Sequence, residues 1–170
     1  MKPLIFDATP LIHLTKVGHA SLIEAIPTRK FAARSVFREV VERGKAKGLA
    51  DALALAHLFE GEAITIADAS DIVLPRTLAK IRGLEEPDAE TLAIAKEFNY
   101  RAVLDDLLAR RVARTYDIDF VGTPHVIILG INNSLLTKEE AVNAIDDMIE
   151  TGWRCGPELY REIVRLLRES

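Results

Sequence analysis

Short runs of apolar residues alternate with helix-forming segments along most of this chain of 170 residues. Each run is short enough for a buried strand, and capping residues or proline usually follow it, as at the start of a helix. Strands that alternate with helices form parallel sheets whose two faces are covered. The pattern therefore predicts an α/β fold of three layers, with a central parallel sheet of about five strands and helices at the C-terminal end.

The chain is long enough for one ordinary domain and its hydrophobic core. We expect a single domain over residues 1–170, with a core of about 1–133 and a helical extension of about 134–170. Thr9 and Ser35 are the expected caps of the helices that follow them. We expect strands near residues 4–6, 31–33, 63–66, 101–104 and 118–121, and closing helices near 123–133, 137–151 and 157–168.

Composition favours a cytoplasmic protein without a membrane span. Apolar residues make up 49% of the chain and charged residues 28%, which is ordinary for a soluble domain. The apolar stretches are too short to cross a bilayer, and the N-terminus opens on a strand and not on a secretion signal. The single cysteine, Cys155, cannot form an internal disulfide, which fits a reducing compartment.

The net charge of −4 argues against an open basic surface that grips nucleic acid through many phosphate contacts. It does not exclude a nuclease whose acidic residues hold metal ions, because bound cations reverse the local sign of the field. Arg110, Arg111 and Arg114 are basic residues near the acidic positions. Their spacing favours a solvated helix face.

Two acidic positions stand directly after predicted strands. Asp7 follows the run Leu4–Phe6, and the pair Asp105 and Asp106 follows residues 102–104. Parallel strands deliver their carboxyl ends to one side of a sheet, where open α/β folds place their ligand crevice. We therefore expect these carboxylates to share a site.

Clustered carboxylates need a reason, because like charges close together raise each other's pKa values. A hard cation such as Mg²⁺ or Mn²⁺ removes that cost, since it prefers oxygen ligands. The same ions polarise phosphoryl oxygens and activate water. The histidines show no ligand spacing, so an all-acid site points to phosphodiester hydrolysis and away from zinc chemistry.

Each acid also has an ordinary structural interpretation. Asp7 and Asp106 are placed to cap the helices that follow them, and Asp88 falls in the first turn of another, where it complements the helix dipole. Glu39 resembles any exposed helix glutamate. Taken singly, these interpretations are favoured over function.

The order of five short blocks resembles the PIN-domain family. In that family an aspartate ends the first strand with a hydroxyl residue two positions on, a glutamate follows a short hydrophobic stretch, an acid starts an alanine-rich helix, and an aspartate follows the fourth strand. Here these blocks are residues 4–12, 35–40, 87–95 and 103–111, and the turn at 122–123 matches the start of the last core helix.

The resemblance implies a metal-dependent ribonuclease and assigns roles by matching position. Asp105 is an ambiguous neighbour of the fourth ligand. Thr9, Thr123 and the acid Glu90 are supporting residues. The implied ligands of Mg²⁺ or Mn²⁺ are Asp7, Glu39, Asp88 and Asp106.

The closest likeness is to small prokaryotic PIN proteins that act as toxins in VapBC-type toxin–antitoxin pairs. It implies an RNA substrate, an antitoxin protein as partner and a homodimer. An alternative is a PIN-fold module that binds metal or a partner with little nuclease activity. A receiver domain of the response-regulator type also has acids at strand ends, but it needs a lysine after a late strand, and residues 118–123 provide none.

Overall fold

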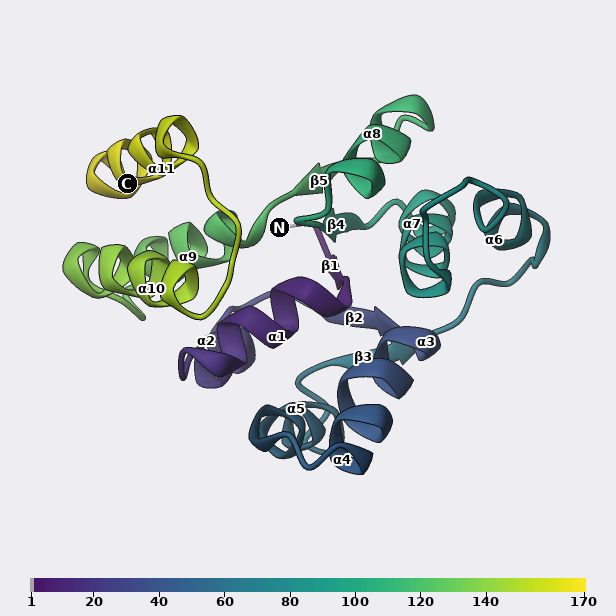
Figure 1. Ribbon diagram of the computed structural model, residues 1–170, viewed down its shortest axis with the longest axis horizontal. Helices are drawn as coiled ribbons and strands as arrows, with labels where there is room; N and C mark the ends of the chain where they lie inside the picture. The colour runs from purple at the N-terminus through teal and green to yellow at the C-terminus, as the bar shows by residue number, and fades with distance from the viewer. Residues whose placement is uncertain (1) are drawn as a thin grey trace.

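Five parallel strands form the central sheet of the computed structural model, which describes residues 2–170. Their order is β3-β2-β1-β4-β5, so β1 lies in the middle. The predicted three-layer α/β architecture is confirmed (Figure 1). The strands are β1 (Leu4–Phe6), β2 (Lys30–Ala33), β3 (Thr65–Ala67), β4 (Arg101–Val103) and β5 (Phe120–Val121).

Helices fill the connections between strands and close the chain. One long helical stretch contains a π-helical segment, η1, between two α-helical segments. The helices are α1 (Ala8–Lys16), α2 (Ala20–Ala25), α3 (Arg34–Phe37), η1 (Arg38–Arg43), α4 (Gly44–Ala46), α5 (Ala50–Glu60), α6 (Val73–Leu78), α7 (Glu86–Phe98), α8 (Leu107–Thr115), α9 (Thr123–Asn132), α10 (Lys138–Glu150) and α11 (Pro157–Glu169).

The chain reverses its direction across the sheet beside β1. It runs from β1 outward to β2 and β3, and then returns to β4 on the other side of β1. Right-handed crossovers consequently place the helices of the two halves on opposite faces. Helix α7 packs on β1, β2 and β4, whereas α1 and α2 lie with α5, α9 and α10 on the other face (Figure 1). Such a reversal opens a crevice at the carboxyl ends of the neighbouring strands, here β1 and β4.

The central strand anchors the core. All residues of β1 are buried, and Ile5 and Phe6 are completely inaccessible. This burial on both faces explains why the strand is apolar without alternation. The residue after it, Asp7, therefore starts from a fixed position.

The closing helices belong to the same hydrophobic cluster as the sheet. Met148, Trp153, Ile163 and Leu167 are buried in it. The division into a core of residues 1–133 and an extension of 134–170 stays a prediction.

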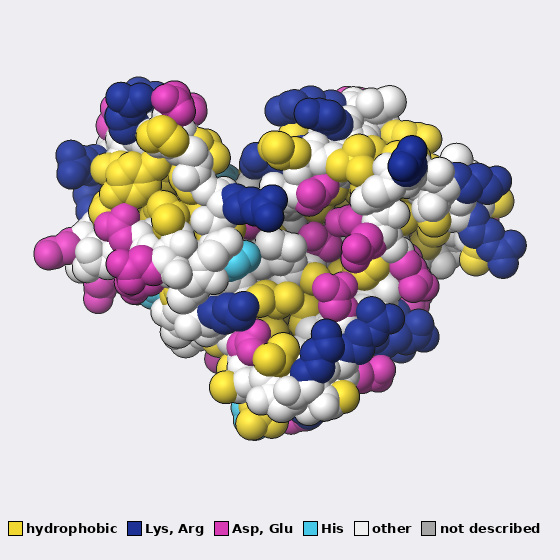
Figure 2. Space-filling view, in the orientation of Figure 1, with side chains coloured by type: hydrophobic (Ala, Val, Ile, Leu, Met, Phe, Trp, Pro, Cys, Tyr) yellow, Lys and Arg dark blue, Asp and Glu magenta, His cyan; other side chains and the backbone are white. Residues whose placement is uncertain are grey.

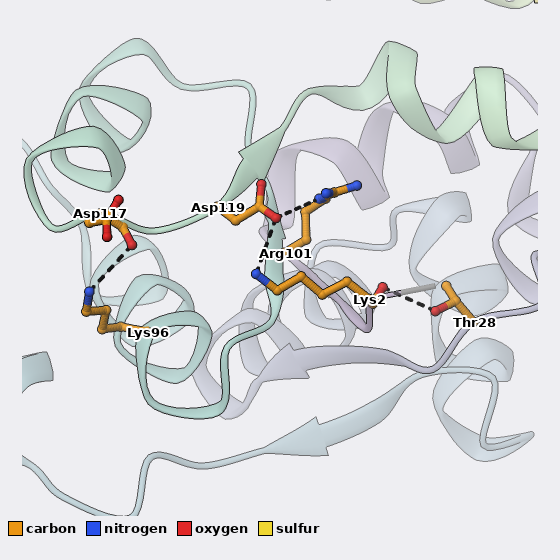
Figure 3. Close-up of polar contacts among 6 residues, drawn as sticks. All are labelled: Lys2, Thr28, Lys96, Arg101, Asp117 and Asp119. Atoms are coloured by element: carbon orange, nitrogen blue, oxygen red, sulfur yellow. Dashed lines mark hydrogen bonds and ion pairs between the residues drawn. The ribbon is translucent and has the colours of Figure 1, made fainter.

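The opposite edge of the sheet, where the strands begin, is held by ionic contacts (Figure 3). Arg101 Nε and Lys2 Nζ lie 3.0 and 3.3 Å from Asp119 Oδ2, which joins the starts of β1, β4 and β5. Thr28 donates to the Lys2 carbonyl and Lys96 to that of Asp117. Burial raises the pKa of Asp119, but its bonds to Arg101 and Lys2 outweigh burial and hold the pKa below its ordinary value.

Two predicted helix caps are wrong. Asp7 and not Thr9 precedes α1, because the extended backbone ends at Asp7 and Ala8 is already helical. Helix α3 begins at Arg34, so Ser35 lies inside it, and its hydroxyl bonds to Glu90 instead. No helix among residues 2–170 has the length and apolar character needed to cross a membrane.

Candidate functional site

A hollow of about 230 Å³ lies at the carboxyl edge of the sheet beside β1 and β4. The four acids of the sequence prediction line it, and they come from different elements. Figure 2 shows Asp and Glu side chains gathered on this face near α7, α8 and α3. The lining acids are Asp7 after β1, Glu39 in η1, Asp88 in α7, Asp106 before α8, and Glu85 before α7.

Local structure fixes two of these acids through one oxygen each. Asp106 Oδ1 accepts a hydrogen bond from the Ala109 backbone at 2.8 Å and so caps α8. Asp88 Oδ2 accepts from the Glu85 backbone at 3.0 Å, as half of a capping box on α7. Capping leaves the second carboxylate oxygen of each residue without a hydrogen bond among residues 2–170. The structural and functional interpretations of these acids are therefore compatible.

Burial and mutual repulsion disfavour the charged forms of three acids. Asp7 is only 3% exposed, and burial together with the charge of Asp88 raises its pKa to about 7. Burial is also the main cause of the raised pKa values of Glu39 and Asp88. The next contribution is Glu85 for Glu39, whereas for Asp88 a backbone hydrogen bond partly offsets burial and Asp106 adds to it.

No basic side chain among residues 2–170 forms an ion pair with any of these five acids. A site with oxygen donors only, whose acids form no ion pair among these residues, fits a hard divalent cation. As the side chains of the described residues stand, no group of three or more acids, histidines or cysteines is arranged to hold a metal ion. Binding a cation therefore requires these side chains to draw together.

Asp105 has a different environment from Asp106. Its carboxylate accepts hydrogen bonds from the Thr123 backbone at 2.9 Å, from the Thr123 hydroxyl at 2.6 Å and from Trp153 Nε1 at 2.9 Å. Asp105 thus joins the end of β4 to the start of α9 and to the loop before α11. These donors occupy the carboxylate, so Asp105 is placed to stabilise the site and Thr123 acts through it.

The other supporting residues take separate positions. Thr9 is half-buried in the first turn of α1 and lines the acidic hollow. Glu90 does not line it. Its Oε2 accepts hydrogen bonds from the hydroxyl and backbone of Ser35 at 2.5 and 3.2 Å. This contact ties α7, which carries Asp88, to the helical stretch that carries Glu39.

A second cleft of about 510 Å³ adjoins the acidic hollow and shares Thr9 and Asp106 with it. Its walls come from α1, α8 and the loop of residues 152–156, with Trp153 among its lining residues. In Figure 2 the molecule is hollowed between α8 and α11, with Lys and Arg side chains on both rims. The remaining lining residues are His13, Asp105, Leu107, Arg110, Pro124, Gly152, Arg154, Gly156 and Leu159.

The sequence prediction of a solvated face is wrong for one of the three arginines of α8. Arg111 and Arg114 are exposed, but Arg110 is half-buried, and its inaccessible Nε has no hydrogen-bond partner within residues 2–170. Its guanidinium carbon lies 5.6 Å from the centre of the Phe120 ring, within range of a cation–π contact. Arg114 lies 5.4 Å from the same ring centre and stays exposed, so the feature that sets Arg110 apart is its close approach to Gly122, where a Cβ would lie 2.7 Å from its Nη2.

Sequence reasoning missed two further residues at the site. Glu85 lines the acidic hollow, and its place as the cap of α7 was a usable signal. Trp153 lies outside the sequence motifs, yet its indole nitrogen donates a hydrogen bond to Asp105 across 48 positions of the sequence. No local sequence pattern predicts a contact between residues so far apart in the chain.

Comparison of the sequence with models of known protein families identifies the family to which this fold belongs. A family model described as a PIN domain matches residues 3–169. The chain belongs to the PIN-domain family. A search of curated proteins finds no match.

PIN domains are typically nucleases that act on RNA and generally use divalent metal ions. The acidic hollow of this PIN domain is compatible with that chemistry through its oxygen donors, its buried Asp7 and the absence of ion pairs to its acids among residues 2–170. The sequence blocks that resemble the PIN-domain family therefore reflect membership of that family, and the match extends over residues 3–169.

Proposed function

We propose that this PIN domain is a ribonuclease that depends on Mg²⁺ or Mn²⁺ and hydrolyses phosphodiester bonds of RNA. The observation that carries the proposal is the convergence of Asp7, Glu39, Asp88 and Asp106 on one hollow without a basic partner among the described residues. These acids are the proposed ligands and catalytic residues. Carboxylates that repel one another without a cation become favourable ligands when one is present.

A divalent ion in this hollow would supply charge neutralisation, polarisation of a phosphoryl oxygen and a more acidic water molecule. The chain's own contribution is positioning. Burial fixes Asp7 at the end of β1, and capping contacts orient Asp88 and Asp106 so that one oxygen of each stays available. Thr9 lines both the acidic hollow and the second cleft, so it lies where the two meet.

Cleavage of an end-labelled single-stranded RNA during a manganese titration tests the proposal. The wild-type protein should cleave with a rate that saturates in Mn²⁺. Asp7→Asn should lower the rate at least about a hundredfold, because it removes charge at the most buried ligand position. Glu42→Gln is the matched control, since Glu42 is exposed on the same π-helix as Glu39 and does not line the hollow. Equal cleavage by the wild-type protein and Asp7→Asn would contradict the assignment.

The finer proposal is that the chain is the VapC-like toxin of a toxin–antitoxin pair, acting as a homodimer in the cytoplasm. The likeness of motifs supports it, and α11 exposes Leu159 and Leu166 as apolar surface for a partner. Expression of the wild-type chain should arrest growth, and co-expression of its antitoxin, to be sought among short neighbouring reading frames, should restore it. Arrest by Asp7→Asn as well would dissociate toxicity from the acids.

A second candidate is a module that binds a metal ion or a partner without turnover. It is favoured by one observation, that no set of three ligands among residues 2–170 is already arranged for a metal ion. Saturable Mn²⁺ binding without cleavage of any of a panel of RNAs identifies this alternative. Cleavage that follows Mn²⁺ occupancy excludes it.

A further inference from the structure

The second cleft is chemically complementary to the acidic hollow beside it. Two arginines, Arg110 and Arg154, line it from opposite walls, and neither forms an ion pair among residues 2–170. Of the two acids that line this cleft, half-buried Asp105 is occupied by donors from Thr123 and Trp153, and exposed Asp106 caps α8 through one oxygen. Positive charge in the cleft is therefore available to an anionic ligand.

Arg110 is held in place without a carboxylate. It stacks near Phe120, and a Cβ on Gly122 would lie 2.7 Å from its Nη2, so the glycine leaves room for the guanidinium against the backbone. Its inaccessible Nε has no acceptor among the described residues, and His13 Nδ1 on the facing wall also lacks a partner. Buried polar atoms without partners are costly in a protein alone. Both atoms are inaccessible, so a ligand in the cleft would meet the guanidinium of Arg110 at its terminal nitrogens.

Apolar surface stands at the mouth of the same cleft. Leu107 at the start of α8 is 67% exposed, and Leu159 in α11 is 41% exposed. Both line the cleft. A ligand that combines a flat apolar body with an anionic group matches these walls, and a nucleotide is such a ligand.

We propose that this second cleft holds the nucleotide adjacent to the scissile phosphate of single-stranded RNA, with Arg110 and Arg154 contacting its phosphate and Leu107 and Leu159 contacting its base. This proposal rests on the proposed ribonuclease function and names the form of its substrate. The shared lining residues Thr9 and Asp106 make the cleft continuous with the acidic hollow, so one strand can occupy both.

The shape of the cleft selects a single strand. Its volume of about 510 Å³ is within the range of sites that enclose a small ligand. A duplex keeps its bases stacked inside and presents only backbone and groove edges, whereas unpaired bases can be splayed into a protein pocket. A duplex of the same sequence should therefore bind poorly.

Binding measured without turnover separates this inference from the nuclease assignment. Fluorescence anisotropy with a labelled single-stranded RNA is carried out in the Asp7→Asn background, adding Arg110→Gln or Arg154→Gln. Each should weaken binding about five- to tenfold and reduce the salt dependence by close to one phosphate contact, a slope change of about 0.7. Arg111→Gln is the matched control, because Arg111 is the exposed neighbour on α8 and does not line the cleft.

Arg154 is exposed in a loop, so Arg154→Gln tests the cleft even if Arg110→Gln fails to fold. Binding by both cleft variants equal to that of Arg111→Gln overturns the inference, as does equal affinity for duplex and single strand. If the wild-type chain cleaves RNA and both variants keep its KM, the inference fails and the nuclease assignment stands. If no RNA is cleaved but both variants lose binding, the nuclease assignment fails and the RNA subsite stands.

Discussion

Asp7 is the acid of the hollow whose negative charge is most disfavoured by burial. It is almost inaccessible, it follows a fully buried strand, and its pKa is raised to about 7 by burial and the neighbouring acids. A carboxylate in this setting is costly when ionised and alone. The cost is removed when a proton or a cation neutralises the charge.

The pH dependence of stability tests this description. Because the folded pKa of Asp7 lies near 7 and its ordinary value is 3.8, the native state holds an extra proton between these limits. The free energy of unfolding of the metal-free protein should therefore fall as pH rises from about 4 to 7, by roughly 3–4 kcal/mol from this group. Asp7→Asn should remove that fall, so urea unfolding at pH 5 and pH 8 should show the two proteins diverging. Parallel stabilities at both pH values would contradict it.

The residues show what a sequence can predict about this site. Asp7 and one member of the pair Asp105 and Asp106 were predictable because strand ends of a parallel sheet meet at one edge. It was not predictable which member of the pair faces the hollow, because the choice depends on hydrogen bonds that Thr123 and Trp153 donate from distant segments. Arg110 was misread because its surroundings, Phe120 and Gly122, lie outside its own helix.

At the scale of elements, two helical units carry the acids that the strands do not. Glu39 lies in η1, where the winding departs from the α-helical period, and Asp88 lies in the first turn of α7. π-helical segments are frequent at functional sites, but periodicity assumes 3.6 residues per turn and gives no warning of one. Glu39 and Asp88 were consequently reached through family resemblance and not through spacing.

The contact of Ser35 with Glu90 couples these two helical units. Ser35→Ala should lower the free energy of unfolding by about 1.5–3 kcal/mol, the range for a hydrogen bond to a charged group. Because Glu39 and Asp88 lie on the two tied elements, Mn²⁺ affinity should fall as well. Ser70→Ala is the control, since Ser70 is exposed and only its backbone contacts an acid, Glu97. Denaturant unfolding and manganese titration measure the two effects, and unchanged affinity in Ser35→Ala would refute the coupling.

At the scale of the whole molecule, the C-terminal helices complete both the core and the site. Met148, Trp153, Ile163 and Leu167 are buried in the same cluster as the sheet. The loop between α10 and α11 also supplies a donor to Asp105 and one wall of the second cleft. Fold class and strand positions followed from local patterns, but this contact between residues 48 positions apart did not.

Removal of residues 134–170 should abolish cooperative folding. Burial of each large apolar side chain contributes about 1.5–3 kcal/mol, so four of them amount to roughly the whole stability of a typical domain. The chain truncated after Asn133 should show no sharp thermal transition by circular dichroism. A cooperative transition near that of the full chain would instead establish residues 1–133 as an independent core.

The proposed binding of a divalent cation by acids from separate elements is tested most directly by measuring Mn²⁺ binding. Electron paramagnetic resonance of free Mn²⁺ should show saturable binding by the wild-type protein and its loss in Asp7→Asn and Asp106→Asn. Asn remains a good helix cap, so neither change should unfold the protein. Asp105→Asn should lose stability while keeping Mn²⁺ binding, because its carboxylate serves Thr123 and Trp153. Equal Mn²⁺ binding by the wild-type protein, Asp7→Asn and Asp106→Asn would contradict the account.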